Sequence, residues 1–365
     1  MIRALLVDDE APARARLRAL LDEIGGVAVV GEAADADAAR AAIAATTPDV
    51  VFLDIEMPAE RGTDLAATLP EPRPFIVFAT AYERFAVDAF QYDATDYLLK
   101  PVTRQRLQAT LARMRGKLDD RRATARELAA AVRAQAHLLP QELPVAPGYA
   151  LAARTLAARA VGGDFFDAVV AGAQLAFVLG DVAGKGMAAG LIASSVHARW
   201  QAAIRQHDLT LTAMMAALNR DVYRSTEGSR YATLVHGVLD PPSGVVRYVN
   251  AGHPPALLVG AGGDWRRGLA ATAPALGLFD GAGFAAAECA LAPGDTLLVM
   301  SDGVSDALDG HGTEFDLTTL ARLAAAHGDD VSGLTTAVVD AVRAHRGHDQ
   351  TQDDVTVLAL RRLAW

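Results

Sequence analysis

Residues 104–139 read RQRLQATLARMRGKLDDRRATARELAAAVRAQAHLL and divide the 365-residue chain into two unlike halves. The segment has no proline and a single glycine, Gly116, so a long helix is expected. Side chains at alternating spacings of four and three form a seam of the kind that is typical of a coiled coil. The seam positions are Leu107, Leu111, Met114, Leu118, Arg121, Ala125, Leu128, Val132, Gln135 and Leu139.

This seam allows two interpretations. One is a helical coiled-coil linker over residues 104–140, which overlaps the end of the first domain and joins two copies in a homodimer through residues 104–139. The other is one long surface helix. Small or polar side chains at Arg121, Ala125 and Gln135 make the middle of the seam weak and therefore adjustable. Leucine at Arg121 and Gln135 is expected to lock the pairing.

Length and charge limit the class of protein. A chain of 365 residues exceeds the usual size of one hydrophobic core, which predicts two domains. Hydrophobic residues make up 52% of the chain, enough for a core in each. The net charge of −10 argues against a nucleic-acid partner, because phosphate binding requires clustered Lys and Arg.

The sequence also indicates a compartment. Its single cysteine, Cys289, excludes an internal disulfide framework and suits a reducing environment. The first residues turn acidic at Asp8, before the apolar core of a signal peptide could form. No apolar run approaches the roughly 18 residues that span a bilayer. We therefore expect a cytoplasmic protein with no membrane segment.

The first half alternates short apolar runs with segments of helical length. The runs are rich in Val, Leu, Ile and Phe without polar alternation, as is typical of strands buried on both faces of a parallel sheet. They are Arg3–Val7, Val27–Gly31, Val50–Leu53, Phe75–Ala79 and Tyr97–Leu99. This order predicts an α/β domain over residues 1–118 with a five-stranded, doubly wound parallel sheet, whose functional groups gather at the carboxyl ends of the strands.

Reactive side chains follow four of these strands. Asp8 and Asp9 follow the first and Asp54 the third, while Thr80 and Lys100 follow the fourth and fifth. Three carboxylates repel one another unless a cation joins them, and Mg²⁺ prefers oxygen ligands of this kind. With Mg²⁺ bound, Asp54 could attack a phosphoryl group and form an acyl phosphate. Lys100 would neutralise the transferred oxygens, and the Thr80 hydroxyl would donate a hydrogen bond to them.

These motifs resemble those of response-regulator receiver domains. The matching pieces are Leu-Val-Asp-Asp-Glu (6–10), Leu-Asp-Ile-Glu-Met-Pro (53–58) with Gly62, Ala-Thr-Ala-Tyr (79–82) and Asp-Tyr-Leu-Leu-Lys-Pro (96–101). The last two are closest to receivers that carry LytTR DNA-binding domains, although the second half of this chain differs.

The resemblance assigns roles to individual residues. It implies that Asp54 is the phosphoacceptor and that a sensor histidine kinase is the donor. It also implies an Mg²⁺ held by Asp8, Asp9 and the backbone carbonyl of Glu56. The switch residues are then Thr80, Tyr97 and Lys100, of which Tyr97 changes rotamer on phosphorylation.

A different pattern begins at Tyr149. Short turns such as Pro241-Pro242-Ser243-Gly244 separate apolar runs, which indicates hairpins and largely antiparallel sheets. Two helical stretches, Met187–Arg205 and Leu211–Ser225, are expected to cover the outside of a sheet pair. The expected strands are Leu175–Gly180, Tyr231–Leu239, Val245–Asn250, Pro255–Val259, Asp295–Met300 and Val355–Leu360. Residues 149–365 are therefore predicted to form an α+β domain, a β-sandwich flanked by helices.

The aspartates of this half lie in turns beside the strands, several of them next to glycine. The four motifs are Gly162-Gly163-Asp164, Gly180-Asp181-Val182, Ser301-Asp302-Gly303 and Asp353-Asp354-Val355-Thr356. Carboxylate and carbonyl oxygens, with little His and no usable Cys, select Mg²⁺ or Mn²⁺ over zinc. Two such ions about 4 Å apart can hold a hydroxide for in-line attack on a phosphomonoester.

The ordered motifs resemble the SpoIIE-type branch of the metal-dependent serine/threonine protein phosphatases. They include Asn-Ala-Gly-His-Pro-Pro (250–255) and Pro-Gly-Asp (293–295) besides the four above. The resemblance implies two Mg²⁺ or Mn²⁺ ions. Their implied ligands are Asp164, Asp181, the Val182 carbonyl, Asp302 and Asp353, with Asp354 as an accessory residue that is Asn in many relatives.

Some residues depart from the pattern of that branch or allow two roles. Phe166, Ala183 and Ser301 replace common Tyr, Ser and Thr, but no departure removes a ligand, so activity is expected. His253 could act as an acid, although a structural hydrogen-bonding role is favoured. Lys185 could meet a phosphate or face solvent.

Together these features predict a two-component response regulator in which phosphorylation of Asp54 controls a metal-dependent phosphoserine/phosphothreonine phosphatase. By resemblance, its substrate is a phosphorylated STAS-type anti-sigma-factor antagonist in a partner switch. The alternative is a phosphorylation-controlled binding module that uses a phosphatase-like domain without turnover. Receiver-driven DNA binding is excluded for want of a basic recognition helix.

Overall fold

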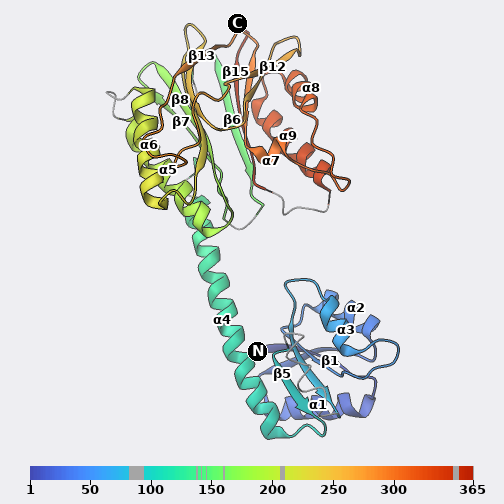
Figure 1. Cartoon of the computed structure of the whole chain (residues 1–365). Helices are drawn as coiled ribbons and strands as arrows, with labels where there is room; N and C mark the ends of the chain where they lie inside the picture. Colours follow the sequence, from blue (N-terminus) through green and yellow to red (C-terminus); the bar gives the residue numbers. More distant parts are fainter. Residues whose placement is uncertain are drawn as a thin grey trace. The chain divides into compact units, whose positions relative to one another are not determined.

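The computed structural model describes residues 1–81, 94–136, 139–140, 142–144, 146–158, 161–205, 210–347 and 353–364. The chain divides into two compact units, Met1–Glu127 and Leu128–Trp365 (Figure 1). None of the helices in the described ranges combines the length and the apolar character that crossing a membrane requires.

The first unit contains one parallel sheet with the strand order β2-β1-β3-β4-β5. Its strands are β1 (Ile2–Val7), β2 (Val27–Ala33), β3 (Val50–Leu53), β4 (Phe75–Thr80) and β5 (Asp96–Leu99). Its first three helices are α1 (Ala11–Ile24), α2 (Ala36–Thr46) and α3 (Gly62–Thr68). All five predicted strands are confirmed, and so is the doubly wound parallel sheet.

Each face of this sheet is closed by helices. Leu17 and Leu21 of α1 pack on one face, and Ala39 of α2 and Leu65 of α3 pack on the other. The strand residues between them are almost completely buried, which explains why their sequence shows apolar runs rather than alternation.

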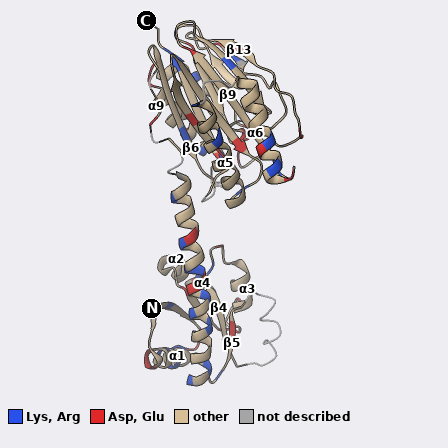
Figure 2. Cartoon of the chain, turned by 90° about the vertical axis from the view of Figure 1, so that its left-hand side faces the viewer, with Lys and Arg blue, Asp and Glu red and all other residues tan. Residues whose placement is uncertain are grey.

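A single helix, α4 (Arg104–Ala136), joins the first unit to the second, and Lys and Arg residues recur along its ribbon, with Asp and Glu between them (Figure 2). The long helix is thus confirmed. Its apolar positions in the first unit pack within the chain, because Leu107, Leu111, Met114 and Leu118 are at most 4% exposed and lie against the parallel sheet beside α1. Helix-on-sheet packing therefore replaces the coiled-coil interpretation of these four positions.

Other seam positions also have contacts within their own unit. The guanidinium of Arg121 lies 5.7 Å from the ring centroid of Phe75, and it donates a hydrogen bond to the Arg73 carbonyl. Leu139 lies beyond the end of α4 and packs against the core of the second unit, while Leu138 is outside the described residues. Leu128, which is 40% exposed, remains open to a partner, so pairing of two copies stays a prediction restricted to the middle of the helix.

The second unit consists of two five-stranded antiparallel sheets. One has the order β13-β10-β9-β8-β7, with β7 (Phe165–Ala171), β8 (Gln174–Val182), β9 (Ala232–Asp240), β10 (Val245–Ala251) and β13 (Ala287–Ala290). The other has the order β12-β11-β14-β15-β6, with β6 (Tyr149–Leu156), β11 (Ala256–Val259), β12 (Trp265–Gly268), β14 (Thr296–Met300) and β15 (Val355–Arg362).

Helices cover both outer faces of this sheet pair (Figure 1). Trp200 of α5 (Met187–Ile204) and Met215 of α6 (Leu211–Thr226) pack on the sheet that contains β8. Leu320 of α8 (Thr318–His327) and Val338 of α9 (Val331–Arg346) pack on the other, and the short helix α7 (Asp302–Ser305) follows β14. A third core, which includes Phe177, fills the space between the sheets. The predicted sandwich flanked by helices is confirmed.

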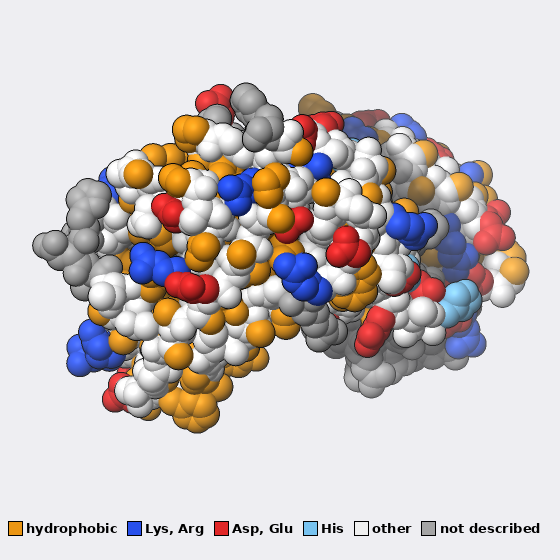
Figure 3. Space-filling model, turned by 90° about the horizontal axis from the view of Figure 1, so that it is seen from above, with side chains coloured by type: hydrophobic (Ala, Val, Ile, Leu, Met, Phe, Trp, Pro, Cys, Tyr) orange, Lys and Arg blue, Asp and Glu red, His pale blue; other side chains and the backbone are white. Residues whose placement is uncertain are grey.

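The surface seen from above is mixed in character. Among the coloured side chains of this face, basic and acidic ones are interspersed with hydrophobic ones rather than gathered by sign (Figure 3).

Candidate functional site

The first candidate site lies at the carboxyl edge of the parallel sheet. Asp8 and Asp9 follow β1 and Asp54 follows β3, and because these strands are neighbours, carboxylate oxygens of all three residues lie within 4.8 Å of one another. Lys100, after β5, places its Nζ 2.7 Å from Oδ2 of Asp8 and 2.7 Å from Oδ2 of Asp54. The predicted group of three carboxylates and one lysine is therefore assembled.

Burial and charge act in opposite directions on this group. Burial raises the pKa of Asp54, and the Asp8 charge raises it further, against the lowering effect of Lys100. Burial alone would lower the pKa of Lys100, but its hydrogen bonds to Asp54 and Asp8 outweigh burial and raise it. Lys100 therefore stays protonated, and a divalent cation beside the carboxylates would favour the ionised form of Asp54.

Three other predicted residues border the same edge. Thr80 ends β4 and is 1% exposed, and its Oγ1 has no hydrogen-bond partner in the described part of the chain. It is thus free to donate to a phosphoryl oxygen. The Glu56 amide donates to Oδ1 of Asp54 over 3.4 Å. Tyr97 is partly buried on β5, while Tyr82 of the Ala-Thr-Ala-Tyr motif lies outside the described residues.

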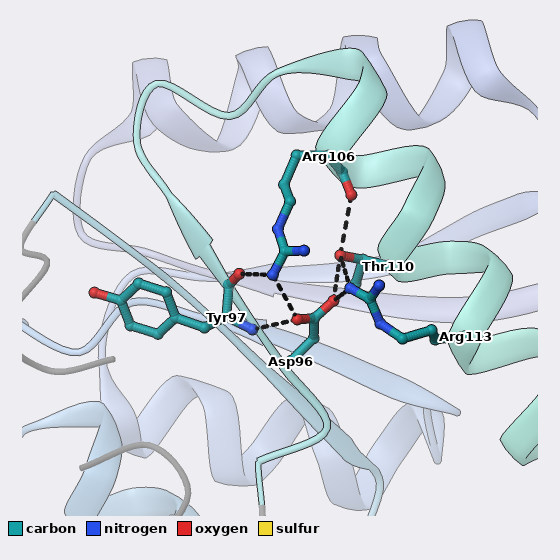
Figure 4. A network of polar contacts seen from close by, with 5 residues as sticks. All are labelled: Asp96, Tyr97, Arg106, Thr110 and Arg113. Atoms are coloured by element: carbon teal, nitrogen blue, oxygen red, sulfur yellow. Dashed lines mark hydrogen bonds and ion pairs between the residues drawn. The ribbon is translucent and has the colours of Figure 1, made fainter. Parts of the chain in front are cut away.

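A polar network that the sequence did not predict ties β5 to α4 (Figure 4). The carboxylate of Asp96 accepts hydrogen bonds from Thr110 Oγ1 at 2.5 Å and from the Tyr97 amide at 2.9 Å. It also forms ion pairs with Arg106, at 2.8 Å, and with Arg113. Burial would raise the pKa of Asp96, but the bonds from Thr110 and Arg113 outweigh burial and lower it. The strand that precedes Lys100 is therefore fastened to the first turns of α4.

The second candidate site lies at one end of the two antiparallel sheets. Asp164 directly precedes β7 and Asp181 lies near the end of its partner β8, where Phe165 pairs with Gly180. Asp302 follows β14 and Asp353 precedes its partner β15. Because neighbouring antiparallel strands end and begin at the same edge, Asp164 lies beside Asp181 and Asp302 beside Asp353. The charges of Asp302 and Asp353 also act on Asp181, so the two pairs lie at the same end of the sandwich.

Asp164 is buried, whereas Asp181, Asp302 and Asp353 are partly exposed, and these four carboxylates repel one another. Burial, followed by the charge of Asp181, raises the pKa of Asp164 well above its usual range, and Asp164 Oδ2 has no hydrogen-bond partner among the described residues. Burial and the charges of Asp302 and Asp353 raise the pKa of Asp181 to about 7. Burial and the charge of Asp353 likewise raise the pKa of Asp302. Such a group of repelling oxygens fits hard divalent cations, which would stabilise the ionised form of every member.

The carboxylate of Asp354 binds backbone amides. Its Oδ1 accepts the Ala158 amide at 2.8 Å and its Oδ2 accepts the Gly163 amide at 2.9 Å, so both oxygens hold the backbone of the loop before Asp164. A Cβ at Gly163 would lie 2.8 Å from the Val182 carbonyl oxygen, so glycine lets this loop approach the end of β8. Asp354 thereby positions the Asp164 loop against Asp181 and Val182.

His253 and Lys185 occupy contrasting positions. His253 is 2% exposed, with its Nδ1 2.8 Å from Thr233 Oγ1, and its amide donates to Asn250 Oδ1. Burial lowers the pKa of His253 to about 4, so the ring is neutral near pH 7 and its contacts agree with a structural role. Lys185 is exposed and forms an ion pair with Asp353 at 3.3 Å.

Helix α4 also contacts this site, through a residue that the sequence motifs did not include. Gln135, near the end of α4, donates from Nε2 to the Gly162 carbonyl at 2.7 Å. Gly162 belongs to the same loop as Asp164, so the helix touches the loop that presents a candidate metal ligand. The sequence placed Gln135 in a coiled-coil seam, and no motif pointed to this contact.

The two folds are those of a response-regulator receiver and of a phosphatase domain of the SpoIIE type. The family model for stage II sporulation protein E (SpoIIE) matches residues 171–363, more than half of the chain, and the response regulator receiver domain model matches residues 4–112. The chain belongs to the SpoIIE family and carries an N-terminal receiver domain.

Solved structures agree with this assignment. The RsbU and RsbW domains of a Mycobacterium tuberculosis protein are 32% identical, with a TM-score of 0.54, and the match covers 62% of this chain and 63% of that one. The SiaA-PP2C domain of Pseudomonas aeruginosa is 21% identical, with a TM-score of 0.56 and coverage of 66% of this chain and 98% of that domain, which supports the fold alone.

Curated relatives share a shorter segment. An uncharacterized response regulatory protein of Yersinia pestis is 51% identical over 115 residues, 31% of this chain and 48% of the relative. The transcriptional regulatory protein BtsR of Escherichia coli is 47% identical over 116 residues, 32% of this chain and 48% of BtsR. The chain therefore spans about half the length of the curated relatives it matches.

Proposed function

We propose that this chain is a two-component response regulator in which phosphorylation of Asp54 controls a metal-dependent phosphoserine/phosphothreonine protein phosphatase. The observation that carries the phosphatase activity is the group of repelling carboxylates around buried Asp164, whose Oδ2 has no hydrogen-bond partner among the described residues. A purely structural role would not retain such a group, because unpaired buried carboxylates destabilise a fold.

The chain's own oxygens divide the work at this site. Asp164, Asp181, Asp302 and Asp353, with the Val182 carbonyl, would hold two Mg²⁺ or Mn²⁺ ions. When bound, the ions would supply the activation of water and the neutralisation of charge that hydrolysis of a phosphomonoester requires. Burial of Asp164 and Val182 keeps bulk water from that side, and exposed Lys185 is placed to attract the phosphate of a protein substrate.

At the receiver, Asp8, Asp9 and the Glu56 carbonyl would hold one Mg²⁺. The carboxylate of Asp54 attacks the phosphorus of a phosphohistidine in a sensor kinase, so a P–O bond forms as the P–N bond breaks and the electron pair returns to the imidazole. Lys100 already contacts Asp54 and Asp8, and the Thr80 hydroxyl has a free hydrogen to donate to the new phosphoryl group.

Control would pass through α4. At its start, the Asp96 network joins this helix to β5, the strand that carries Tyr97. Near its end, Gln135 bonds to the loop of Asp164. A change at the phosphorylated edge that shifts α4 would therefore move a metal-ligand loop. Exposed Leu128 marks the part of the helix where a homodimer could form.

The proposed substrate is a phosphorylated STAS-type anti-sigma-factor antagonist, which the likeness to the RsbU-containing structure supports. Purified protein with Mn²⁺ should release phosphate from such a phosphoprotein. Asp302→Asn should abolish release, whereas Asp340→Asn, at an exposed site on α9, should not. Full turnover by Asp302→Asn would contradict the metal-site assignment.

The alternative is a binding module without turnover. A calorimetric Mn²⁺ titration separates the two, because two metal-binding events in the second unit are expected only for the enzyme. A binding module would also leave the phosphate on a bound phosphoprotein.

A further inference from the structure

Arg346, the last residue of α9, is a buried cation that belongs to neither set of motifs. It is 5% exposed. Its Nη1 donates to the Asp353 carbonyl at 2.7 Å, and its Nη2 donates to the Gly303 carbonyl at 2.6 Å. One guanidinium thus bridges the backbone of a candidate metal ligand, Asp353, and the backbone of the residue that follows another, Asp302.

The two loops that Arg346 joins are in direct contact. Ser301 Oγ donates to the Asp354 carbonyl at 3.3 Å and accepts the Thr356 amide at 3.0 Å. A Cβ at Gly303 would lie 1.8 Å from the Asp354 carbonyl oxygen, so only glycine permits this approach. The carboxylates of Asp302 and Asp353 nevertheless repel each other, so the loops need a tie that resists separation.

A guanidinium suits this task better than an ammonium. Its planar fork carries donors in fixed directions and can hold two acceptors at a set spacing. Lysine presents a single point of charge on a flexible stem, so it would keep the positive charge but lose the fixed bridge.

We propose that Arg346 is a positioning residue that holds the Asp302 and Asp353 loops at the spacing required for divalent-cation binding. This inference rests on the proposed function, because it takes Asp302 and Asp353 to be metal ligands. Arg346 acts through these two residues and would touch neither ion nor substrate.

The test compares Arg346→Lys with Arg343→Lys in the full chain. Arg343 lies one turn earlier on α9, and its half-exposed side chain is 3.8 Å from Asp340, so it is a matched control. Calorimetry measures Mn²⁺ affinity, thermal unfolding in chelator measures metal-free stability, and hydrolysis of para-nitrophenyl phosphate is followed against Mn²⁺ concentration. Arg346→Lys should weaken Mn²⁺ binding to the second unit at least about tenfold, or about 1.4 kcal/mol.

The kinetic result should separate positioning from folding. Excess Mn²⁺ should restore kcat in Arg346→Lys with KM for para-nitrophenyl phosphate unchanged, and Arg343→Lys should match the parent protein. Unchanged Mn²⁺ affinity in Arg346→Lys would overturn the inference, and so would failure of this variant to fold, since Arg346 would then be a structural residue. If the parent protein binds Mn²⁺ but hydrolyses nothing, the proposed function fails while weaker binding by Arg346→Lys still supports the positioning role.

Discussion

Without metal, the phosphatase unit should lose stability as pH rises, and Asp181→Asn should remove much of that loss. The pKa of Asp181 is raised from 3.8 to about 7, so between these values the folded state binds a proton that the unfolded state has released. Stability therefore falls as pH rises through this window and levels off above pH 7. A shift of about three pKa units at about 1.4 kcal/mol each gives a ceiling of about 4 kcal/mol for Asp181 and the neighbouring Asp164 together.

Tryptophan fluorescence offers a selective assay. The three tryptophans of the chain, Trp200, Trp265 and Trp365, all belong to the second unit, so urea unfolding followed by their emission reports that unit alone. In chelator at pH 8, Asp181→Asn should be more stable than the parent protein, and the difference should shrink as pH approaches 4. Added Mn²⁺ should reverse the order, because the parent protein gains binding free energy that the variant has lost.

Exposed Asp340 provides the control, since Asp340→Asn should follow the parent protein at every pH. If Asp181→Asn were no more stable than the parent protein at pH 8 in chelator, the account of a strained carboxylate group would be wrong. If Mn²⁺ stabilised both proteins equally, the assignment of Asp181 as a metal ligand would be wrong.

Three further predictions concern the receiver and the helix. Gln135→Leu removes the donor to the Gly162 carbonyl, which should lower the stability of this contact by about 1–3 kcal/mol. The ratio of phosphatase rates with and without beryllofluoride should then fall toward one, whereas Gln108→Leu, at an exposed site on the same helix, should leave this ratio unchanged. Lys100→Met leaves buried Asp54 and Asp8 without their cation, so the pKa of Asp54 should rise further. Phosphorylation of Asp54 by acetyl phosphate should then require a higher pH, and an unchanged pH profile of phosphorylation would contradict this. Asp96→Asn weakens the ties to Arg106 and Arg113 and should destabilise the receiver by about 1–3 kcal/mol while Asp54 still accepts phosphate, as thermal unfolding and phosphate labelling would show.

The sequence predicted the receiver well because its strands are buried on both faces. Runs such as Val50–Leu53 are apolar throughout, and the side chains that follow them necessarily meet at one edge of a parallel sheet. The strand β6, YALAARTL, was missed because Ala and Arg have little strand preference, and its conformation comes from pairing with β15. Strand β7 was missed as well, although it begins directly after the recognised motif Gly162-Gly163-Asp164.

The packing of α4 shows a different limit of prediction from sequence. A spacing of four and three places Leu107 and Leu111 on one side of a helix, but it does not say whether a second helix or a sheet covers that side. The contact of Gln135 with Gly162 and the bridge formed by Arg346 depend on the tertiary fold, so no local pattern could reveal them.

The most direct test of the central claim is the rate of phosphate release from a phosphorylated STAS-domain protein in Mn²⁺, with and without beryllofluoride as a mimic of the acyl phosphate at Asp54. The account predicts that beryllofluoride changes the rate for the parent protein and leaves Asp54→Asn unaffected. Equal rates for the parent protein in both conditions, or no phosphate release in either, would contradict it.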